Sequence, residues 1–235
     1  MGKIIDFHSH ILPGIDDGSR SSEMSREILS VCKDQGIDIQ IATPHFYASH
    51  NTPEHFLEKR EAAYEKVKPI AESLGIELLK GAEVAFFRGM SESESLDDLL
   101  ISDTGLLLLE MPFRQWNEND LKEIRQIKKR NILPIIAHIE RFYSYQKDKE
   151  FIDELLDMDL IVQVNAEALL SFGQRHKAVK LFKDGDAQLI ASDCHNTTSR
   201  AQNLKEGRAV LEKKLGKEIL NQIDDLGEKL LSRKR

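Results

Sequence analysis

The sequence predicts an α/β fold whose parallel strands close into a barrel. Seven short apolar segments alternate with amphipathic segments of helical period, a pattern typical of parallel sheets. The apolar segments, such as Ile132–Ala137, are hydrophobic at almost every position, which indicates burial on both faces. Six of the seven end beside a residue that can bind a metal ion. A doubly wound open sheet concentrates its site at one switch point, whereas a barrel uses nearly every strand, so the barrel is favoured.

The order of elements follows from hydrophobic period and from turn residues. Pro53 suits the first turn of a helix, and Gly36 and Gly75 suit helix ends. The expected strands are Lys3–Phe7, Ile37–Thr43, Ile76–Lys80, Gly105–Leu109, Ile132–Ala137, a sixth ending at Asn165, and Gln188–Ser192. The expected helices are Ser21–Gln35, Pro53–Leu74, Asn117–Arg130, Lys147–Met158, Ser171–Lys183, Thr198–Leu215 and Lys217–Ser232. No linker or repeat interrupts this alternation, so one domain over residues 1–235 is expected.

Composition excludes several classes of protein. The net charge is −7, and the basic residues are dispersed among acidic ones, so a nucleic-acid footprint is not expected. No apolar segment is long enough to span a bilayer. The two cysteines, Cys32 and Cys194, form no disulfide framework, and a reducing cytoplasm is the expected compartment.

The residues at the strand ends form a candidate metal centre. His8 and His10 are two apart on an extended segment and can face one ion, and Asp193 and His195 repeat that spacing. A buried lone carboxylate is costly unless it is paired or bound to a cation. Asp16 is equally compatible with a plain turn residue, and Asn165 with a supporting or turn role. The candidate ligands are His8, His10, Asp17, His45, Glu83, Glu110, His138, Asp193 and His195.

Nine candidates are too many for one ion of four to six ligands, so two or three divalent ions are expected. Imidazole and carboxylate ligands fit Mn²⁺, Fe²⁺ or Zn²⁺ without deciding among them. Arg141 and Arg200 follow His138 and His195 closely, and guanidinium groups suit phosphoryl oxygens. The alternative for both arginines is an ordinary surface or salt-bridged role.

One segment fits a different mechanism. Cys194 and Arg200 have the C-x5-R spacing of cysteine-dependent tyrosine phosphatases. The segment lacks the glycines of a phosphate-binding loop, and the neighbouring Asp193 would raise the thiol pKa, which disfavours a thiolate nucleophile. A thiolate mechanism would also leave the residues at the other strand ends unexplained.

Motifs along nearly the whole chain resemble the polymerase-and-histidinol-phosphatase (PHP) superfamily of metal-dependent phosphoesterases. The matching stretches are Asp6–His10, Thr43–His45, Glu83, His138 and Asp193–His195. Residues 10–19, 41–45, 136–141 and 191–196 are most similar to the bacterial capsule and exopolysaccharide tyrosine-protein phosphatases of the CpsB/CapC type.

The resemblance implies a distorted seven-stranded β/α barrel of the TIM-like type, with a trinuclear, usually manganese-dependent site. It implies that the nine candidates are ligands, that Arg141 and Arg200 clamp phosphate, and that Asp17 serves the catalytic site. The implied substrate is phosphotyrosine on a bacterial tyrosine autokinase that controls polysaccharide export. One departure is Ile139, where the family pattern has Pro, and this change is expected to loosen the placement of Arg141.

Three interpretations therefore compete. The main one is a tyrosine phosphatase that uses a metal-bridging hydroxide as its nucleophile. The second keeps the site but gives it a small phosphomonoester such as histidinol phosphate. The third is a metal-stabilised scaffold that binds the kinase without catalysis. The sequence does not predict the oligomeric state.

Overall fold

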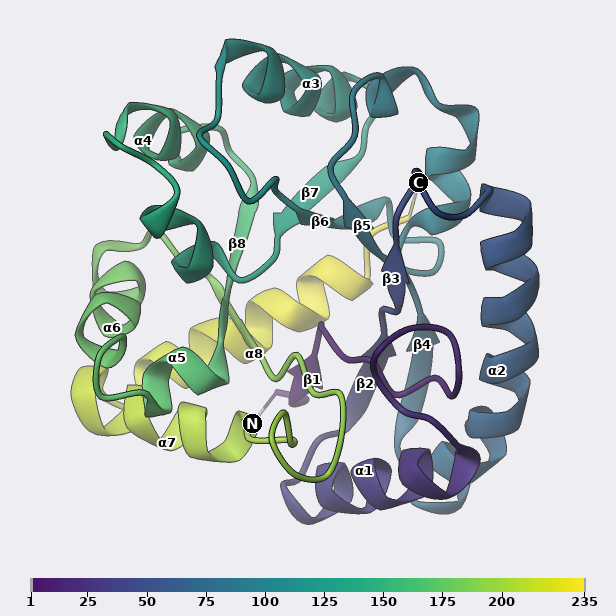
Figure 1. Ribbon diagram of the computed structural model, residues 1–235. Coiled ribbons are helices and arrows are strands. Elements are labelled where there is room, and N and C mark those ends of the chain that lie inside the picture. The colour runs from purple at the N-terminus through teal and green to yellow at the C-terminus, as the bar shows by residue number, and fades with distance from the viewer. Residues whose placement is uncertain (1, 235) are drawn as a thin grey trace.

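All named strands are parallel and lie in two sheets. The computed structural model describes residues 2–234, one residue short of the expected domain at each end (Figure 1). The smaller sheet has the order β1 (Ile5–Asp6), β2 (Ile39–Ala42) and β4 (Glu77–Lys80). The larger sheet has the order β3 (His45–Phe46), β5 (Glu83–Ala85), β6 (Leu106–Glu110), β7 (Leu133–Ile136), β8 (Ile161–Asn165) and β9 (Leu189–Ala191). The parallel α/β prediction is confirmed.

The described residues contain nine strands rather than the expected seven, and they form two sheets rather than one closed ring. Two expected strands are each followed by a second short strand, β3 after β2 and β5 after β4. Pro44, which has no N–H to donate, lies in the first break, and Gly81 lies in the second. A single bridge between Ser9 and Cys194 links the segments that follow β1 and β9.

The helices follow the predicted order with shorter bounds in several places. The expected 171–183 helix begins only at Arg175, after a loop and a separate short helix over residues 166–170, and a loop also replaces the start of the expected 198–215 helix. In that loop the Asn196 side chain accepts hydrogen bonds from the N–H groups of Thr198 and Arg200. The helices are α1 (Ser22–Asp34), α2 (Pro53–Ser73), α3 (Glu118–Lys129), α4 (Glu150–Leu156), α5 (Ala166–Leu170), α6 (Arg175–Asp184), α7 (Leu204–Leu215) and α8 (Glu218–Leu231).

Three 3₁₀ segments were not predicted. They follow strands or precede them as short connections, and each has only three to six residues. They are η1 (Met90–Glu92), η2 (Glu94–Leu99) and η3 (Ile139–Ser144). Of these, η3 matters most for the site because it begins directly after His138 and contains Arg141.

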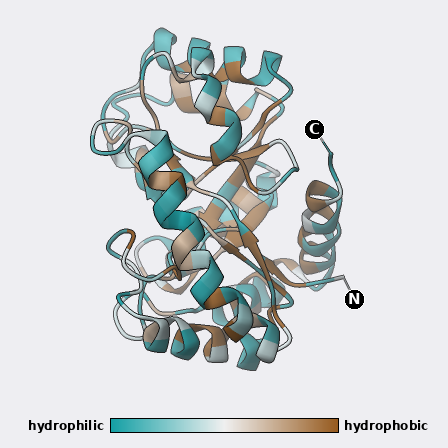
Figure 2. Ribbon diagram, turned by 90° about the vertical axis from the view of Figure 1, so that its right-hand side faces the viewer, coloured by the Kyte–Doolittle hydropathy of each residue, from teal (hydrophilic) through white to brown (hydrophobic). Residues whose placement is uncertain are grey.

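Helix α8 covers the amino ends of the strands and leaves the carboxyl ends open. It lies behind the strands in Figure 1 and beside the sheets in Figure 2. Gly227 permits this close packing, since a Cβ there would lie 3.2 Å from Ile5 and 3.3 Å from Phe7. A bidentate ion pair between Arg208 of α7 and Asp224, with N–O distances of 2.7 and 2.8 Å, fixes α8 to α7. The candidate ligands therefore gather at the opposite end.

Within residues 2–234, every helix is too short or too polar to cross a membrane.

Candidate metal centre

His8 and His10 lie on the extended segment that continues β1, and both are fully buried. Their Nε2 atoms face each other at 3.1 Å. Two imidazole nitrogens at this distance require a proton or another cation between or beside them, because two lone pairs repel. As predicted, these two side chains, two residues apart on an extended segment, point in the same direction.

Glu83, at the start of β5, lies at the centre of the cluster. Its Oε2 lies 3.1 Å from His8 Nε2, 3.3 Å from His10 Nε2 and 2.8 Å from His45 Nδ1. Its other oxygen, Oε1, accepts a hydrogen bond of 2.8 Å from His138 Nε2. One buried carboxylate therefore contacts four imidazole rings, which come from three strands because His8 and His10 both follow β1.

The structure brings all nine candidate residues together. Three overlapping groups have ligand atoms within 4.8 Å of one another. They are His8, His10 and Asp193; His10, Asp17, His45 and His195; and His45, Glu83 and Glu110. The ninth candidate, His138, joins them through Glu83 and through Glu110, whose Oε1 lies 3.5 Å from His138 Nε2. The other candidates are mostly buried, whereas the Asp17 side chain is 63% exposed.

The residues carry strongly shifted pKa values. Burial lowers the pKa of His10, but the hydrogen bond with Asp16 and the close contacts with Asp193 and Glu83 outweigh it and raise the pKa well above its usual range. His138 is likewise buried, and hydrogen bonds with Glu110 and Glu83 raise its pKa to about 9. Burial alone would raise the pKa of Glu83, but the charge of His8 and the close contacts with His10, His138 and His45 hold it well below its usual range. The cluster thus favours bound cations.

The donor set fits divalent metal ions. Glu83 Oε2, His45 Nδ1 and His195 Nε2 are buried atoms that make no hydrogen bond of good geometry. They nevertheless face other ligand-type atoms, as where His195 Nε2 lies 3.3 Å from Asp17 Oδ1. Buried polar atoms are normally satisfied, so an orphaned set that points inward is what residues around cations would leave. Imidazole and carboxylate donors without thiolate suit Mn²⁺, Fe²⁺ or Zn²⁺.

We expect the metal-free protein to lose stability as the pH rises from about 6.5 to about 9. The folded-state pKa of His138 is raised to about 9, so its contribution is present below the unfolded value and is lost as the pH rises through the folded one. The folded-state pKa values of His10 and His45 are also raised. The loss from His138 alone is roughly 3 kcal/mol. Urea unfolding in chelator at several pH values measures it.

Manganese should reverse this trend, because metal binding requires deprotonated imidazoles and strengthens as the pH rises. A metal-free protein whose free energy of unfolding stays constant from pH 6.5 to 9 would contradict the assigned proton binding.

Both predicted arginines contact one candidate ligand. Arg141 Nη2 donates to Asp193 Oδ2 at 2.7 Å, and Arg200 Nη2 lies 2.9 Å from each Asp193 oxygen. Arg200 Nη1 also lies 3.4 Å from Asp17 Oδ2. The side chains of Arg141 and Arg200 are 31% and 30% exposed, so both guanidiniums border the open side of the cluster. Ile139 therefore does not keep Arg141 away from the centre.

Three supporting residues were missed or left undecided by the sequence analysis. Asp16 is more than a turn residue, since its Oδ2 lies 2.7 Å from His10 Nδ1 and accepts the His45 N–H at 2.9 Å. Gln163 Oε1 lies 3.2 Å from His8 Nδ1 and accepts the His138 N–H at 2.9 Å. Asn165 Nδ2 donates to Asp193 Oδ2 at 2.8 Å. Such partners orient imidazole and carboxylate ligands.

Two candidate ligands lie on strained backbone. His138 has φ 31° and Asp193 has φ 54°, in the left-handed region that residues other than glycine rarely adopt. Hydrogen bonds hold both in place, because the His138 N–H donates to Gln163 Oε1 and the Asp193 N–H donates to the His8 carbonyl. Strain of this kind concentrates at functional sites.

Cys194 does not border the centre as a nucleophile would. It is completely buried, and burial raises the pKa of its thiol well above the usual range. Its Sγ lies 4.0 Å from Gln202 Nε2, an atom that also contacts Cys32. A buried neutral thiol is unreactive, which argues against the C-x5-R interpretation.

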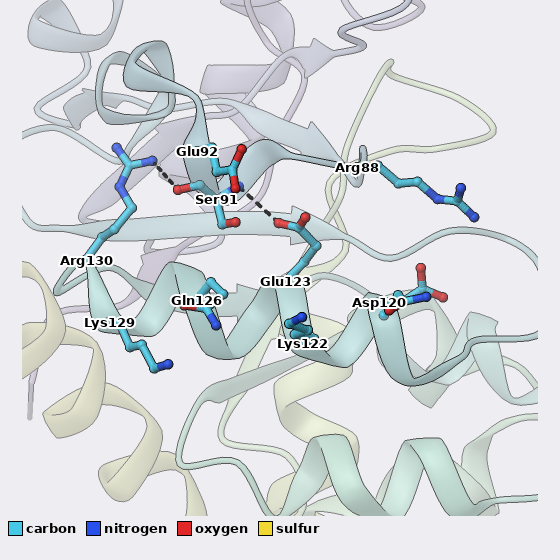
Figure 3. A pocket seen from close by; sticks show the side chains of 10 residues that line it. Arg88, Ser91, Glu92, Asp120, Lys122, Glu123, Gln126, Lys129 and Arg130 are labelled. Atoms are coloured by element: carbon cyan, nitrogen blue, oxygen red, sulfur yellow. Dashed lines mark hydrogen bonds between the residues drawn. The ribbon is translucent and has the colours of Figure 1, made fainter.

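A surface hollow of about 670 Å³ lies beside α3, and none of the nine candidate ligands lines it. In Figure 3, Glu123 and Arg130 both turn toward Ser91. Glu123 accepts the N–H groups of Gly89 and Ser91, and Arg130 donates to the carbonyls of Ser91 and Ser93. These hydrogen bonds hold the segment after β5 against α3. The charged residues around the hollow therefore have a structural role.

Comparisons with known proteins agree with this geometry. The chain is 30% identical over 236 residues to the tyrosine-protein phosphatase YwqE of Bacillus subtilis, covering 97% of this chain and 91% of the relative. It is 28% identical over 232 residues to the tyrosine-protein phosphatase CpsB of Streptococcus agalactiae, covering 94% of each.

A solved structure is also similar. It comes from work on YwqE of Bacillus subtilis and CpsB of Streptococcus pneumoniae, described as unique metal-dependent tyrosine phosphatases. The TM-score is 0.86 with 26% identity, over 99% of this chain and 96% of the other. In addition, residues 4–228 match the family model described as capsular polysaccharide synthesis, CpsB/CapC. The chain belongs to the CpsB/CapC family.

Proposed function

We propose that this protein is a metal-dependent protein-tyrosine phosphatase. The observation that carries the proposal is the convergence of Arg141 and Arg200 on Asp193, beside a buried cluster of imidazoles and carboxylates. A metal site alone has many uses, but two guanidinium groups at its open side suit the oxygens of a phosphoryl group. The relatives named tyrosine-protein phosphatases support the choice of substrate class.

The proposed ligands are the nine residues predicted from the sequence: His8, His10, Asp17, His45, Glu83, Glu110, His138, Asp193 and His195. When bound, two or three divalent ions, with Mn²⁺ proposed as the physiological metal, would acidify water and neutralise charge on the phosphoryl group. Asp16 and Gln163 hold the rings of His10 and His8 in position.

The arginines act on the substrate directly in this proposal. Each guanidinium already donates to Asp193, and each side chain stays partly exposed and has further N–H groups. These groups would orient the phosphoryl oxygens and stabilise the negative charge that develops during transfer to water. Asp17, as the most exposed carboxylate of the cluster, would line the same opening.

The proposal also covers the protein substrate and the cellular compartment. The substrate would be a phosphotyrosine-containing protein, a bacterial tyrosine autokinase that regulates capsule or exopolysaccharide synthesis, and the compartment would be the cytoplasm. The family description in terms of capsular polysaccharide synthesis supports this context. We further propose that the two sheets act together as one distorted barrel-like domain, with all candidate ligands at one end.

A substrate comparison tests the function. The manganese-loaded protein should hydrolyse a phosphotyrosyl peptide with a kcat/KM at least about 100-fold above those for histidinol phosphate and a phosphoserine peptide. Cys194→Ser should retain most of this activity, because the thiol is buried and has a raised pKa. Initial rates of phosphate release measure both.

Faster hydrolysis of histidinol phosphate than of the phosphotyrosyl peptide would contradict the proposal and support the small phosphomonoester as substrate. Tight binding of a phosphorylated kinase without phosphate release would favour the scaffold. Loss of activity in Cys194→Ser, with the fold preserved by circular dichroism, would revive the thiolate mechanism.

A further inference from the structure

Two exposed aromatic side chains stand on adjacent loops beside the metal centre. Phe113, three residues after Glu110, is 44% exposed, and Tyr145, four residues after Arg141, is 45% exposed. Large hydrophobic side chains are otherwise mostly buried in the part of the chain that the structure describes. Exposed aromatic rings at the edge of a polar cluster are a common feature of ligand sites.

Phe113 is packed against a candidate ligand rather than extended into solvent. Its ring is stacked on the ring of His138, with centroids 6.2 Å apart and an interplanar angle of 19°. It also contacts buried Phe142 at 5.0 Å, and Tyr145 edge-on at 5.5 Å and 66°. Phe113 and Tyr145 thus form one aromatic wall, which is anchored on Phe142 and reaches the edge of the centre.

Hydrogen bonds from two glutamine side chains join the two loops that carry Phe113 and Tyr145. Gln146 Oε1 accepts the Trp116 N–H at 2.9 Å, and Gln146 Nε2 donates to the Arg114 carbonyl at 2.9 Å. Gln115 Oε1 accepts the Lys147 N–H at 2.7 Å. These bonds join the residues around Phe113 to those around Tyr145. Pre-ordered side chains lose less entropy when a ligand binds, so the wall is already arranged for contact.

A third ring lies beside another histidine of the centre. Tyr47, half-buried, has its ring centroid 5.2 Å from that of His45. His45 contacts Glu83 Oε2 and His138 contacts Glu83 Oε1, so Tyr47 and Phe113 each lie next to a histidine that contacts the same carboxylate. Aromatic rings therefore lie next to two of the histidines that contact Glu83.

The proposed metal ligands are more deeply buried than these rings. His8, His10 and Glu83 are completely buried, whereas Phe113 and Tyr145 are nearly half exposed. Since the proposed ligands are buried, a phosphoryl group bound beside them would place its ester substituent on the solvent side, where it can contact the two exposed rings. A phenyl ring is long and flat enough to make that contact, while the single methylene of phosphoserine would draw the peptide backbone into the same space.

We propose that Phe113 and Tyr145 form the wall that receives the phenyl ring of phosphotyrosine, with Tyr47, beside His45, as a further contact, and thereby select aryl over alkyl phosphate esters. The inference rests on the proposed phosphatase function and specifies its substrate selectivity. Aromatic pairs add to the free energy of simple burial through offset or edge-to-face contacts. Phe113 and Tyr145 are positioning residues, because they hold the leaving group and do not contact the phosphoryl oxygens.

Binding of two phosphonates to the manganese-loaded protein tests this wall. Titration calorimetry with phenylphosphonate and methylphosphonate gives the ratio of their Kd values, without any need for turnover. The unaltered protein should prefer phenylphosphonate. Phe113→Ala should weaken phenylphosphonate binding by about tenfold and leave methylphosphonate binding within about twofold. Phe113→Tyr should retain the preference, because it keeps the ring.

Phe172→Ala is the matched control, since Phe172 is 98% exposed on the loop after α5. It should leave both Kd values unchanged. Equal weakening of both ligands by Phe113→Ala, no change in either, or no preference in the unaltered protein would each overturn the proposed wall.

The same proteins assayed on a phosphotyrosyl peptide separate the two proposals. If the unaltered protein prefers phenylphosphonate but releases no phosphate from the peptide, the proposed function fails and the aryl site stands. If it hydrolyses the peptide and Phe113→Ala keeps the full kcat/KM, the function stands and the wall fails.

Discussion

Glu83→Gln is expected to reduce phosphatase activity by at least about 10³-fold. Glu83 is completely buried and contacts His8, His10, His45 and His138 through its two oxygens. Glutamine preserves the shape but removes the negative charge and places an NH₂ group among the imidazole nitrogens. The variant should therefore lose the charge that holds cations there. Steady-state kinetics on a phosphotyrosyl peptide at saturating Mn²⁺ measure the loss.

Glu77→Gln is a matched control on the preceding strand, β4. Glu77 forms a surface ion pair with Lys3 at 3.2 Å, and its side chain is 52% exposed. Surface pairs contribute little, so this variant should keep the rate and the stability of the unaltered protein. Activity of Glu83→Gln within tenfold of the unaltered rate would remove Glu83 from the centre.

Arg200→Met should lower kcat/KM by about 10² to 10³-fold while the metal content stays constant. Arg200 donates to both oxygens of Asp193 and reaches Asp17, and its partly exposed guanidinium borders the opening. The loss removes donors from the phosphoryl group rather than ligands from the metals. Arg200→Lys should recover only a small part, because an ammonium group cannot reproduce the planar fork. Kinetics combined with metal analysis of the same samples test both statements.

Arg26→Met, on the exposed face of α1, is the control for loss of one positive charge and should leave the rate unchanged. If Arg200→Met lost its metals together with its activity, the arginine would be a structural partner of Asp193. If it kept full activity, the phosphate clamp would be wrong.

The positions of the nine candidate ligands could be predicted because of the topology of parallel strands. The apolar strands end at the same side of the two sheets, so residues such as His138 and Asp193, far apart in sequence, meet there. The period of two along an extended chain also correctly paired His8 with His10. These inferences needed only local pattern and strand direction.

The supporting residues depend on tertiary contacts that local pattern does not encode. Asp16 has the sequence context of a turn, and only the folded loop brings it to His10 Nδ1. Gln163 carried a weak signal, since an amide in the apolar strand β8 shares a face with Asn165. The expected strands end at Thr43 and Lys80, and the short strands β3 and β5 that follow Pro44 and Gly81 were not predicted, because two or three residues carry too little hydrophobic pattern.

The start of α7 was missed for a similar reason. Helical period extends backward from Leu204, but Asn196 accepts two N–H groups from the segment that follows it. That side chain turns the backbone into a loop and delivers Arg200 to Asp193. A hydrophobic pattern cannot show such a competition between side-chain and helical hydrogen bonds.

The number of metal ions per chain at full activity tests the central claim most directly. Metal-free protein is titrated with Mn²⁺, and bound metal and phosphate release from a phosphotyrosyl peptide are measured on the same samples, with Glu83→Gln in parallel. The unaltered protein should reach full activity only with more than one ion bound, and Glu83→Gln should bind fewer ions and remain inactive. Full activity in chelator, or at one ion or fewer per chain, would contradict the proposed multinuclear phosphatase.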